Sequence, residues 1–182
     1  MERAPASYSL AAKQVLAFAE ALLLSVWLGS MIFFSFAVAP SAFAVLQTRE
    51  MAGALVTSTI NKVELLGLIV GPLLILINAA SWRFKHLGSV AKSTQIILLA
   101  AMIAAAALSH FWITPTMVSL RGAMGGHIDD IPMSDPLRMR FNDLHQYSVA
   151  LMGAAMIAGI VVLLLAVRSW IRSLENHGRS CY

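Results

Sequence analysis

The chain has 182 residues, of which 59% are hydrophobic and 12% are charged. An average soluble domain is about 45–50% apolar and about 25% charged, so this composition excludes an ordinary soluble enzyme and indicates an integral membrane protein. The net charge of +4 does not indicate nucleic-acid binding, because the basic residues flank apolar segments instead of clustering on one face. The single cysteine, Cys181, can form no intrachain disulfide.

Four segments are apolar for long enough to cross a bilayer, which takes about 20 residues. They cover residues 15–38, 63–82, 95–113 and 147–167. We therefore predict an all-α fold: a four-span bundle over residues 15–168, between an N-terminal segment (1–14) and a C-terminal tail (169–182). The first segment is longer than the about 7–15 residues of a signal-peptide core, so we expect an uncleaved span, although residues 42–44 resemble a cleavage site.

The distribution of Lys and Arg predicts the orientation. Four spans place eight of these residues on the side of the termini and five on the other side. The first group is Arg3, Lys13, Arg83, Lys85, Lys92, Arg168, Arg172 and Arg179, and the second is Arg49, Lys62, Arg121, Arg138 and Arg140. The positive-inside rule then predicts cytoplasmic termini, in what we expect to be a bacterial inner membrane.

The two connections on the outer side differ in composition. Residues 41–60 carry apolar side chains on both sides of the polar group Gln47, Arg49 and Glu50, which predicts a short amphipathic helix lying at the membrane interface after the first span. Residues 114–144 are rich in glycine, proline and aspartate, which predicts a water-exposed loop that folds back over the bundle.

Small residues four positions apart occur on three of the spans. The pairs are Ser25 with Gly29, Gly67 with Gly71, and Ala155 with Gly159. Such pairs let helix backbones approach closely in lipid, so we assign these glycines a packing role. Pro72 follows Gly71 and lacks an N–H, which predicts a kink in the second span.

Polar residues at membrane depth are informative because burying them in lipid is costly. They are Glu20, Asn61, Glu64, Asn78, His110 and His145. Glu64, Gly71 and Asn78 are seven residues apart and share one helix face. Asn61, Glu64, His110 and His145 are expected at one depth on the outer side. Glu20 lies in the cytoplasmic half, where it could snorkel, pair with Lys13 or be protonated inside the bundle.

Two imidazoles and a carboxylate suit zinc, copper or iron, and a histidine pair could also ligate haem. Ser148, one turn after His145, could orient its ring or a bound water. The alternative is structural: His110 and His145 would donate hydrogen bonds that fix the helix ends. Methionines inside the spans are expected to fill space, and they include Met31, Met102 and Met152.

Three short motifs resemble those of a known membrane family. They are Trp27-Leu28-Gly29 with Phe33-Phe34-Ser35-Phe36 and Val38-Ala39-Pro40; Trp112-Ile113-Thr114-Pro115 with Leu120-Arg121; and Phe141-Asn142-Asp143-Leu144-His145-Gln146-Tyr147-Ser148. The chain thus resembles a four-helix membrane family of unknown function, with bacterial members and small eukaryotic transmembrane proteins associated with platinum-drug tolerance. That family is distantly similar to copper-resistance-D-type membrane proteins and to four-helix haem-binding protoporphyrinogen oxidases. The resemblance places His145 and Ser148 in a family motif.

The sequence contains neither a phosphate-binding loop nor a G-x-S-x-G elbow, so no catalytic motif indicates a function. Three functions fit the features above. The first is a non-enzymatic membrane protein that handles a metal ion or a small solute at a polar site near the outer face. The second is an accessory or scaffold subunit of a larger membrane complex, or a homo-oligomer. The third, a haem-binding oxidoreductase, is disfavoured because the first span contains no histidine.

Overall fold

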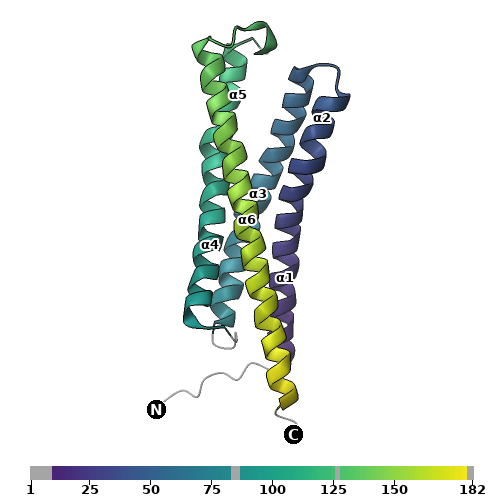
Figure 1. Ribbon diagram of the computed structural model, residues 1–182, viewed down its shortest axis with the longest axis vertical. Helices are drawn as coiled ribbons and strands as arrows, with labels where there is room; N and C mark the ends of the chain where they lie inside the picture. Colours follow the sequence, from purple (N-terminus) through teal and green to yellow (C-terminus); the bar gives the residue numbers. More distant parts are fainter. Residues whose placement is uncertain (1–9, 83–86, 126–127, 180–182) are drawn as a thin grey trace.

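A computed structural model describes residues 10–82, 87–125 and 128–179 (Figure 1). Arg3, Arg83, Lys85 and Cys181 lie outside the described residues. The elements in chain order are α1 (Leu10–Phe33), η1 (Phe34–Val38), α2 (Ala39–Val45), α3 (Arg49–Ser81), α4 (Ser89–Leu108), η2 (Ser109–Ile113), α5 (Thr114–Ala123), η3 (Ile128–Asp130) and α6 (Pro136–Arg179).

These elements build four long helices, because α1, η1 and α2 form one continuous helix and α4, η2 and α5 form another. The prediction of an all-α bundle with four helices able to span a membrane is confirmed. The apolar helical segments able to cross a membrane are 33 to 37 residues long, or about 50 Å at 1.5 Å per residue. That length exceeds the about 30 Å of a hydrocarbon core, so the helices reach well beyond the predicted spans.

The prediction of a separate interfacial helix over residues 41–60 is wrong. Residues 41–45 extend the first helix, a turn follows at 46–48, and α3 starts at Arg49. Thr48 caps α3, since its Oγ1 accepts a hydrogen bond from the backbone N–H of Met51 at 3.2 Å. The amphipathic pattern therefore reflects two helix ends that pass from an apolar into a polar environment.

The predicted loop over residues 114–144 is also mostly helical. α5 continues the third helix to Ala123, and α6 begins at Pro136, so the connection shortens to residues 124–135. Asp135 starts α6 by accepting the N–H of Leu137 on Oδ1 at 2.8 Å, and proline suits the first helical position because it has no N–H to satisfy. Gly125 supplies the positive φ of +68° that ends α5.

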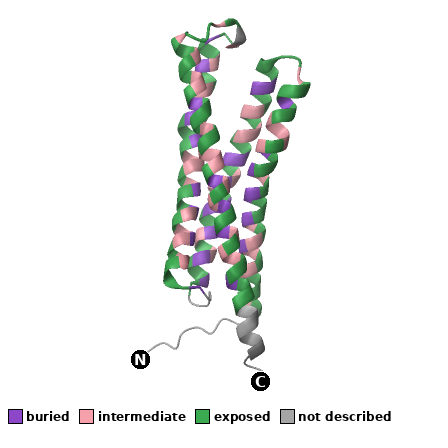
Figure 2. Cartoon of the chain, in the orientation of Figure 1, coloured by how far each residue is buried: buried purple, intermediate pink, exposed green. Residues whose placement is uncertain are grey.

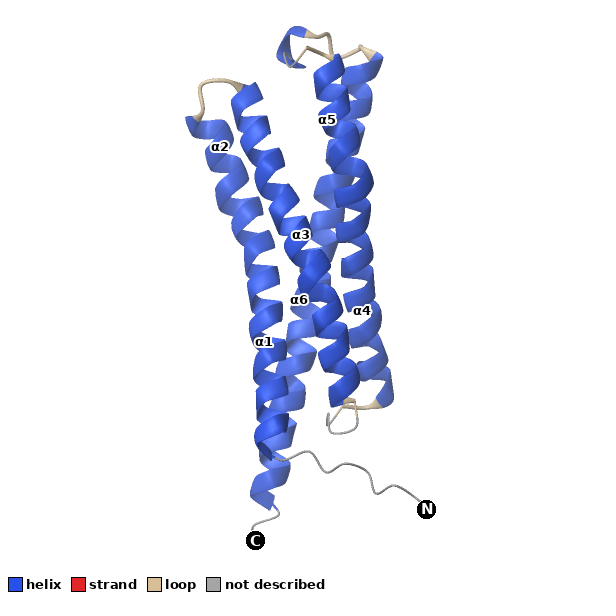
Figure 3. Ribbon diagram, turned by 180° about the vertical axis from the view of Figure 1, so that it is seen from behind, coloured by secondary structure: helices blue, strands red, loops and turns tan. Residues whose placement is uncertain are grey.

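The four helices form a ring in which each packs against two neighbours. α1 packs on α3 and α6, and α4 packs on the same two helices (Figures 1 and 3). We call the end where α1 begins and α6 ends the proximal end, and the opposite one the distal end. The α1–α3 and α4–α6 pairs diverge toward the distal end in both views. There Arg121 of α5 reaches across and donates to Thr57 Oγ1 of α3 at 3.3 Å.

Inward-facing residues recur at a seven-residue spacing along each helix, and exposed positions cover the outside of the bundle (Figure 2). Large apolar side chains occupy many of these exposed positions, as contact with lipid requires. The spacing defines three layers: Glu64, Ser109 and Ser148 at the distal level; Trp27, Gly71, Met102 and Ala155 in the middle; and Glu20, Asn78, Gln95 and Val162 at the proximal level. The layers with polar side chains therefore lie on either side of an apolar middle layer.

Two of the three small-residue pairs pack as predicted. A Cβ on Gly67 would lie 2.6 Å from Nε1 of Trp27, and a Cβ on Gly71 would lie 2.4 Å from Cγ1 of Ile103. A Cβ on Gly159 would likewise lie 3.2 Å from Cδ1 of Leu28. Gly29 is exposed, and no described side chain approaches its Cβ position within 4 Å, so the first pair makes no such contact.

Pro72 does not interrupt the second helix. α3 runs without a break from Arg49 to Ser81, and Pro72 lies on its exposed face.

Candidate functional site

A proline shapes the helix that carries most of the site. Pro115 lacks an N–H, and in a regular α-helix its ring would clash with the carbonyl four residues earlier. The chain responds with the π-helical segment η2, in which the N–H of Thr114 bonds to the carbonyl of Ser109, five residues back. The π turn is wider than an α turn and brings Ser109 and Thr114 toward the same face, where both hydroxyls reach Glu64. In an α-helix they would point about 140° apart.

This face is directed at Glu64 of α3. The side chain of Glu64 is 3% exposed. The Ser109 hydroxyl donates to Glu64 Oε1 in a short hydrogen bond, and the Thr114 hydroxyl lies 3.1 Å from Oε1 and 3.4 Å from Oε2. Hydrogen bonds to a charged group contribute about 1.5–3 kcal/mol each, so the two hydroxyls offset part of the cost of burying the carboxylate.

His110 approaches the second oxygen of the same carboxylate. Its Nδ1 lies 3.5 Å from Glu64 Oε2. That nitrogen is buried and makes no hydrogen bond to the described residues, so it is available to a water or a ligand. We call Glu64, Ser109, His110 and Thr114 the distal cluster. It contains one carboxylate, two hydroxyls and one imidazole nitrogen.

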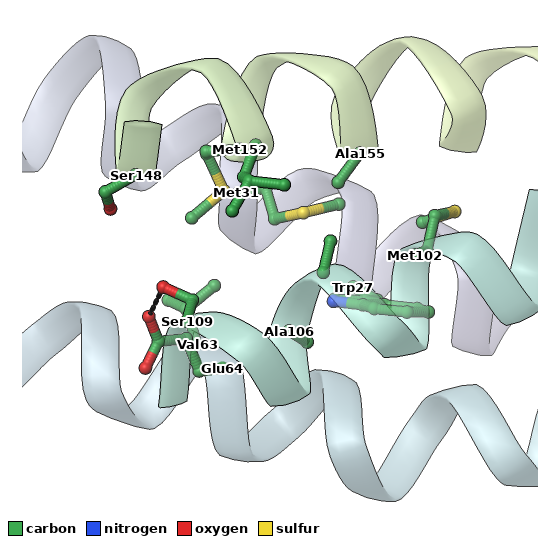
Figure 4. A pocket seen from close by; sticks show the side chains of 12 residues that line it. Trp27, Met31, Val63, Glu64, Met102, Ala106, Ser109, Ser148, Met152 and Ala155 are labelled. Carbon is green, nitrogen blue, oxygen red and sulfur yellow. Dashed lines mark hydrogen bonds between the residues drawn. The ribbon is translucent and has the colours of Figure 1, made fainter. Parts of the chain in front are cut away.

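A cavity of about 30 Å³ adjoins Glu64 in the middle of the bundle (Figure 4). All four helices contribute to its wall, which combines Glu64, Ser109 and Ser148 with apolar side chains and the thioethers of Met31, Met102 and Met152. In Figure 4, Glu64 and Ser109 face Ser148, Met31 and Met152 across the cavity. A space of this size holds one or two water molecules, or an ion of similar size.

The sequence predicted that His145, Glu64 and His110 would converge, and the structure brings together only two of them. His145 is exposed on the outside of α6, and Asn61 is exposed on α3, so neither side chain belongs to the distal cluster. The reason is the angular position of each residue around the axis of α6. The buried stripe of α6 passes through Leu144 and Ser148, and His145 lies about 100° away from Leu144. Ser148 therefore lines the cavity although His145 does not.

Glu20 and Asn78 form a second polar group near the proximal end. Glu20 is 3% exposed, so its side chain does not snorkel to the surface. Its Oε1 accepts hydrogen bonds from Asn78 Nδ2 at 3.1 Å and from Gln95 Nε2 at 2.9 Å. We call Glu20, Asn78 and Gln95 the proximal cluster. It joins α1, α3 and α4.

Ser109, Thr114 and Gln95 were not among the predicted site residues. Ser109 and Thr114 fall on different faces of an α-helix, and only Pro115 signals the π turn that aligns them. Gln95 begins an apolar segment and looks like a residue at a membrane boundary. A signal was available, because Gln95, Met102 and Ser109 repeat the seven-residue spacing of Glu64, Gly71 and Asn78.

Comparison with known proteins gives one match. Residues 22–125 match the sequence profile of a family described as a domain of unknown function (DUF4149). This match covers the first long helix from Leu22 onward, the second and third long helices, and the distal cluster. Neither the curated proteins nor the solved structures include a significant match.

Proposed function

Since the chain belongs to the DUF4149 family, whose description assigns no function, we propose from its geometry that it is a non-enzymatic membrane protein that binds a small metal cation at the distal cluster. One observation carries the proposal: two hydroxyls and an imidazole nitrogen converge on a buried carboxylate beside a small cavity.

The charge of the cluster favours a cation. Glu64 brings a negative charge into a region where a buried charge needs a partner, and the only ionisable side chain of the distal cluster beside it is His110. With His110 neutral, its Nδ1 is free to act as a ligand and the cluster carries one negative charge. A bound cation would balance that charge and be coordinated by Nδ1 of His110.

The size of the cavity favours an ion over an organic solute. About 30 Å³ accommodates an ion with one water, whereas pockets for organic ligands are about 300–1,000 Å³. No group of three His, Cys, Asp or Glu side chains gathers in the described ranges. Hydroxyls, thioethers or water would therefore complete the coordination. Imidazole and carboxylate suit Zn²⁺, while the thioethers of Met31, Met102 and Met152 suit Cu⁺ or its stable analogue Ag⁺.

The test is ion binding to the detergent-purified chain. We expect Zn²⁺ or Ag⁺ to bind in equilibrium dialysis, and Glu64→Gln to lose one bound ion per chain, because an amide supplies no charge. Asp143→Asn is the matched control, since Asp143 is an exposed carboxylate on α6. If Glu64→Gln lowers the melting temperature but leaves the bound ion unchanged, the cluster is a structural hydrogen-bond network and the proposal fails.

The accessory-subunit hypothesis has one observation in its favour. α6 has 44 residues, or about 66 Å, and extends past the other helices at the proximal end (Figure 1). A projecting helix suits contact with a second copy or with another membrane protein. Gentle detergent extraction followed by gel filtration tests this hypothesis, which requires a species larger than the monomer.

The haem hypothesis has the least support. His110 and His145 do not face each other, because His145 is exposed while His110 packs beside Glu64. An absorption spectrum of the purified protein tests it directly, since a bound haem gives a Soret band.

A further inference from the structure

The distal part of the bundle consists of two halves that pack separately. In one half α2 packs on α3, and in the other α5 packs on α6 (Figures 1 and 3). The second half has its own hydrophobic cluster, separate from the main core and built on Ile113, Leu120, Met124 and Leu144. Because each half is packed on its own, the two can move apart at the distal end without disrupting a shared core.

Arg121 connects the two halves. Its guanidinium donates to Thr57 Oγ1 of α3 at 3.3 Å and lies 5.6 Å from the ring centroid of Phe141 on α6. It fills the space left by Gly53, where an added Cβ would lie 2.9 Å from a terminal nitrogen of Arg121. The carboxylate of Glu50, in the first turn of α3, also attracts the guanidinium. One flexible side chain therefore joins α3 to the α5–α6 half.

This connection lies directly distal to Glu64. Thr57 precedes Glu64 by seven residues on α3, and Arg121 follows Thr114 by seven residues on α5. Seven residues of helix rise about 10 Å and return to nearly the same face. The hydrogen bond between Arg121 and Thr57 is therefore about 10 Å further toward the distal end than the hydrogen bonds at Glu64, on the same helix faces.

On its proximal side, the cavity beside Glu64 is closed by the main core. Trp27 is 2% exposed, and Leu74, Leu99 and Met102 are at most 1% exposed, so a solute entering from this side would have to displace tightly packed side chains. On the distal side, the hydrogen bond of Arg121 is what a solute meets on the same helix faces. Breaking one such bond costs far less than opening a packed core.

We propose that Arg121 is a strap across a distal entrance to the cavity. When the guanidinium leaves Thr57, the two halves separate, and a small solute from the distal side reaches Glu64 and Ser148. The strap is a property of the bundle and needs no ion at the distal cluster. It therefore goes beyond the proposed function and is tested independently of it.

A thiol placed in the cavity wall measures how often the entrance opens. Ser148 lines the cavity, so the reporter chain carries Ser148→Cys together with Cys181→Ser, which leaves a single thiol. The full-length protein in lipid nanodiscs is treated with two small methanethiosulfonates, one neutral and one positively charged. Mass spectrometry then gives the rate of modification with each reagent.

Two variants of the reporter chain release the strap in different ways. Gly53→Ala displaces the guanidinium by contact and keeps its charge, whereas Arg121→Gln removes the guanidinium. We expect each to raise the rate about tenfold with both reagents, which is the effect of losing one hydrogen bond to a charged group. The matched controls are Gly122→Ala, where no described atom lies within 4 Å of the added Cβ, and Arg140→Gln, an exposed arginine of α6. Both controls should leave the rate unchanged.

Three results would overturn the proposal. The first is a rate that neither Gly53→Ala nor Arg121→Gln changes. The second is faster modification by the charged reagent alone in Arg121→Gln, since Arg121 would then repel cations without closing an entrance. The third is an equal increase in the control variants, which would indicate general loosening of the bundle. Melting temperatures show that each variant is folded, and Gly53→Ala keeps the test open if Arg121→Gln does not fold, because alanine favours the helix.

Discussion

At the scale of single residues, whether a glycine packs closely against another helix depends on its neighbours in the fold and not on its sequence motif. Gly29 and Gly71 both belong to small-xxx-small pairs, yet Gly71 contacts Ile103 while Gly29 is exposed. The motif marks a position where a helix can approach closely, but only the rotation of each helix about its axis decides whether it does.

We expect Gly71→Ala to destabilise the bundle. The added Cβ would lie 2.4 Å from Ile103 Cγ1, so α3 and α4 must separate or the side chain must shift, at a cost of about 1–3 kcal/mol. Gly29→Ala adds the same methyl group where no described atom lies within 4 Å, and it should be neutral or stabilising. Thermal unfolding in detergent compares the two variants. Equal melting temperatures would mean that the close α3–α4 approach at Gly71 does not limit stability.

At the scale of elements, two prolines produce the same local structure with different consequences. Pro40 follows η1 and Pro115 follows η2, and in each case a five-residue backbone bond closes the π turn. Only η2 carries hydroxyls toward Glu64. The distal cluster therefore depends on the conformation of its helix as well as on the identity of its side chains.

Pro115→Ala tests this dependence. Alanine has an N–H and no ring, so the helix can return to α geometry and turn Thr114 away from Ser109. If the distal cluster binds an ion, we expect its affinity for Zn²⁺ or Ag⁺ to fall about tenfold, which corresponds to 1.4 kcal/mol. Pro40→Ala makes the same change beside the other π segment and should leave the affinity unchanged. Equal effects of the two variants would exclude a specific contribution from η2.

At the scale of the whole molecule, the bundle has two chemically different ends. The start of α1, the end of α3 and the start of α4 lie at the proximal end, where Lys92 donates to the carbonyl of Trp82 at 2.6 Å and links α4 to the end of α3. The distal end carries Arg49, Arg121 and Arg138. The bias of eight Lys and Arg to five favours the proximal end as the cytoplasmic one.

A reporter that is active only in the cytoplasm tests this orientation. Fused after Tyr182, it should give a signal, and inserted after Gly125 it should be silent. The reverse pattern would place the distal cluster on the cytoplasmic side.

The sequence by itself determined the class of the protein, the number of spans and the apolar stripes, because transfer of each residue into lipid depends mainly on its own chemistry. It also marked Glu64 and Asn78 as members of one helix face. Tertiary structure decided which polar groups meet. The π turn before Pro115 aligned Ser109 with Thr114, and the rotation of α6 turned Ser148 inward and His145 outward. Trp27 also packed against α3 where Gly67 and Gly71 leave room for its indole ring. These outcomes depend on the angle of each helix about its axis, which is fixed by contacts among all four helices and is not encoded in the hydropathy of any one.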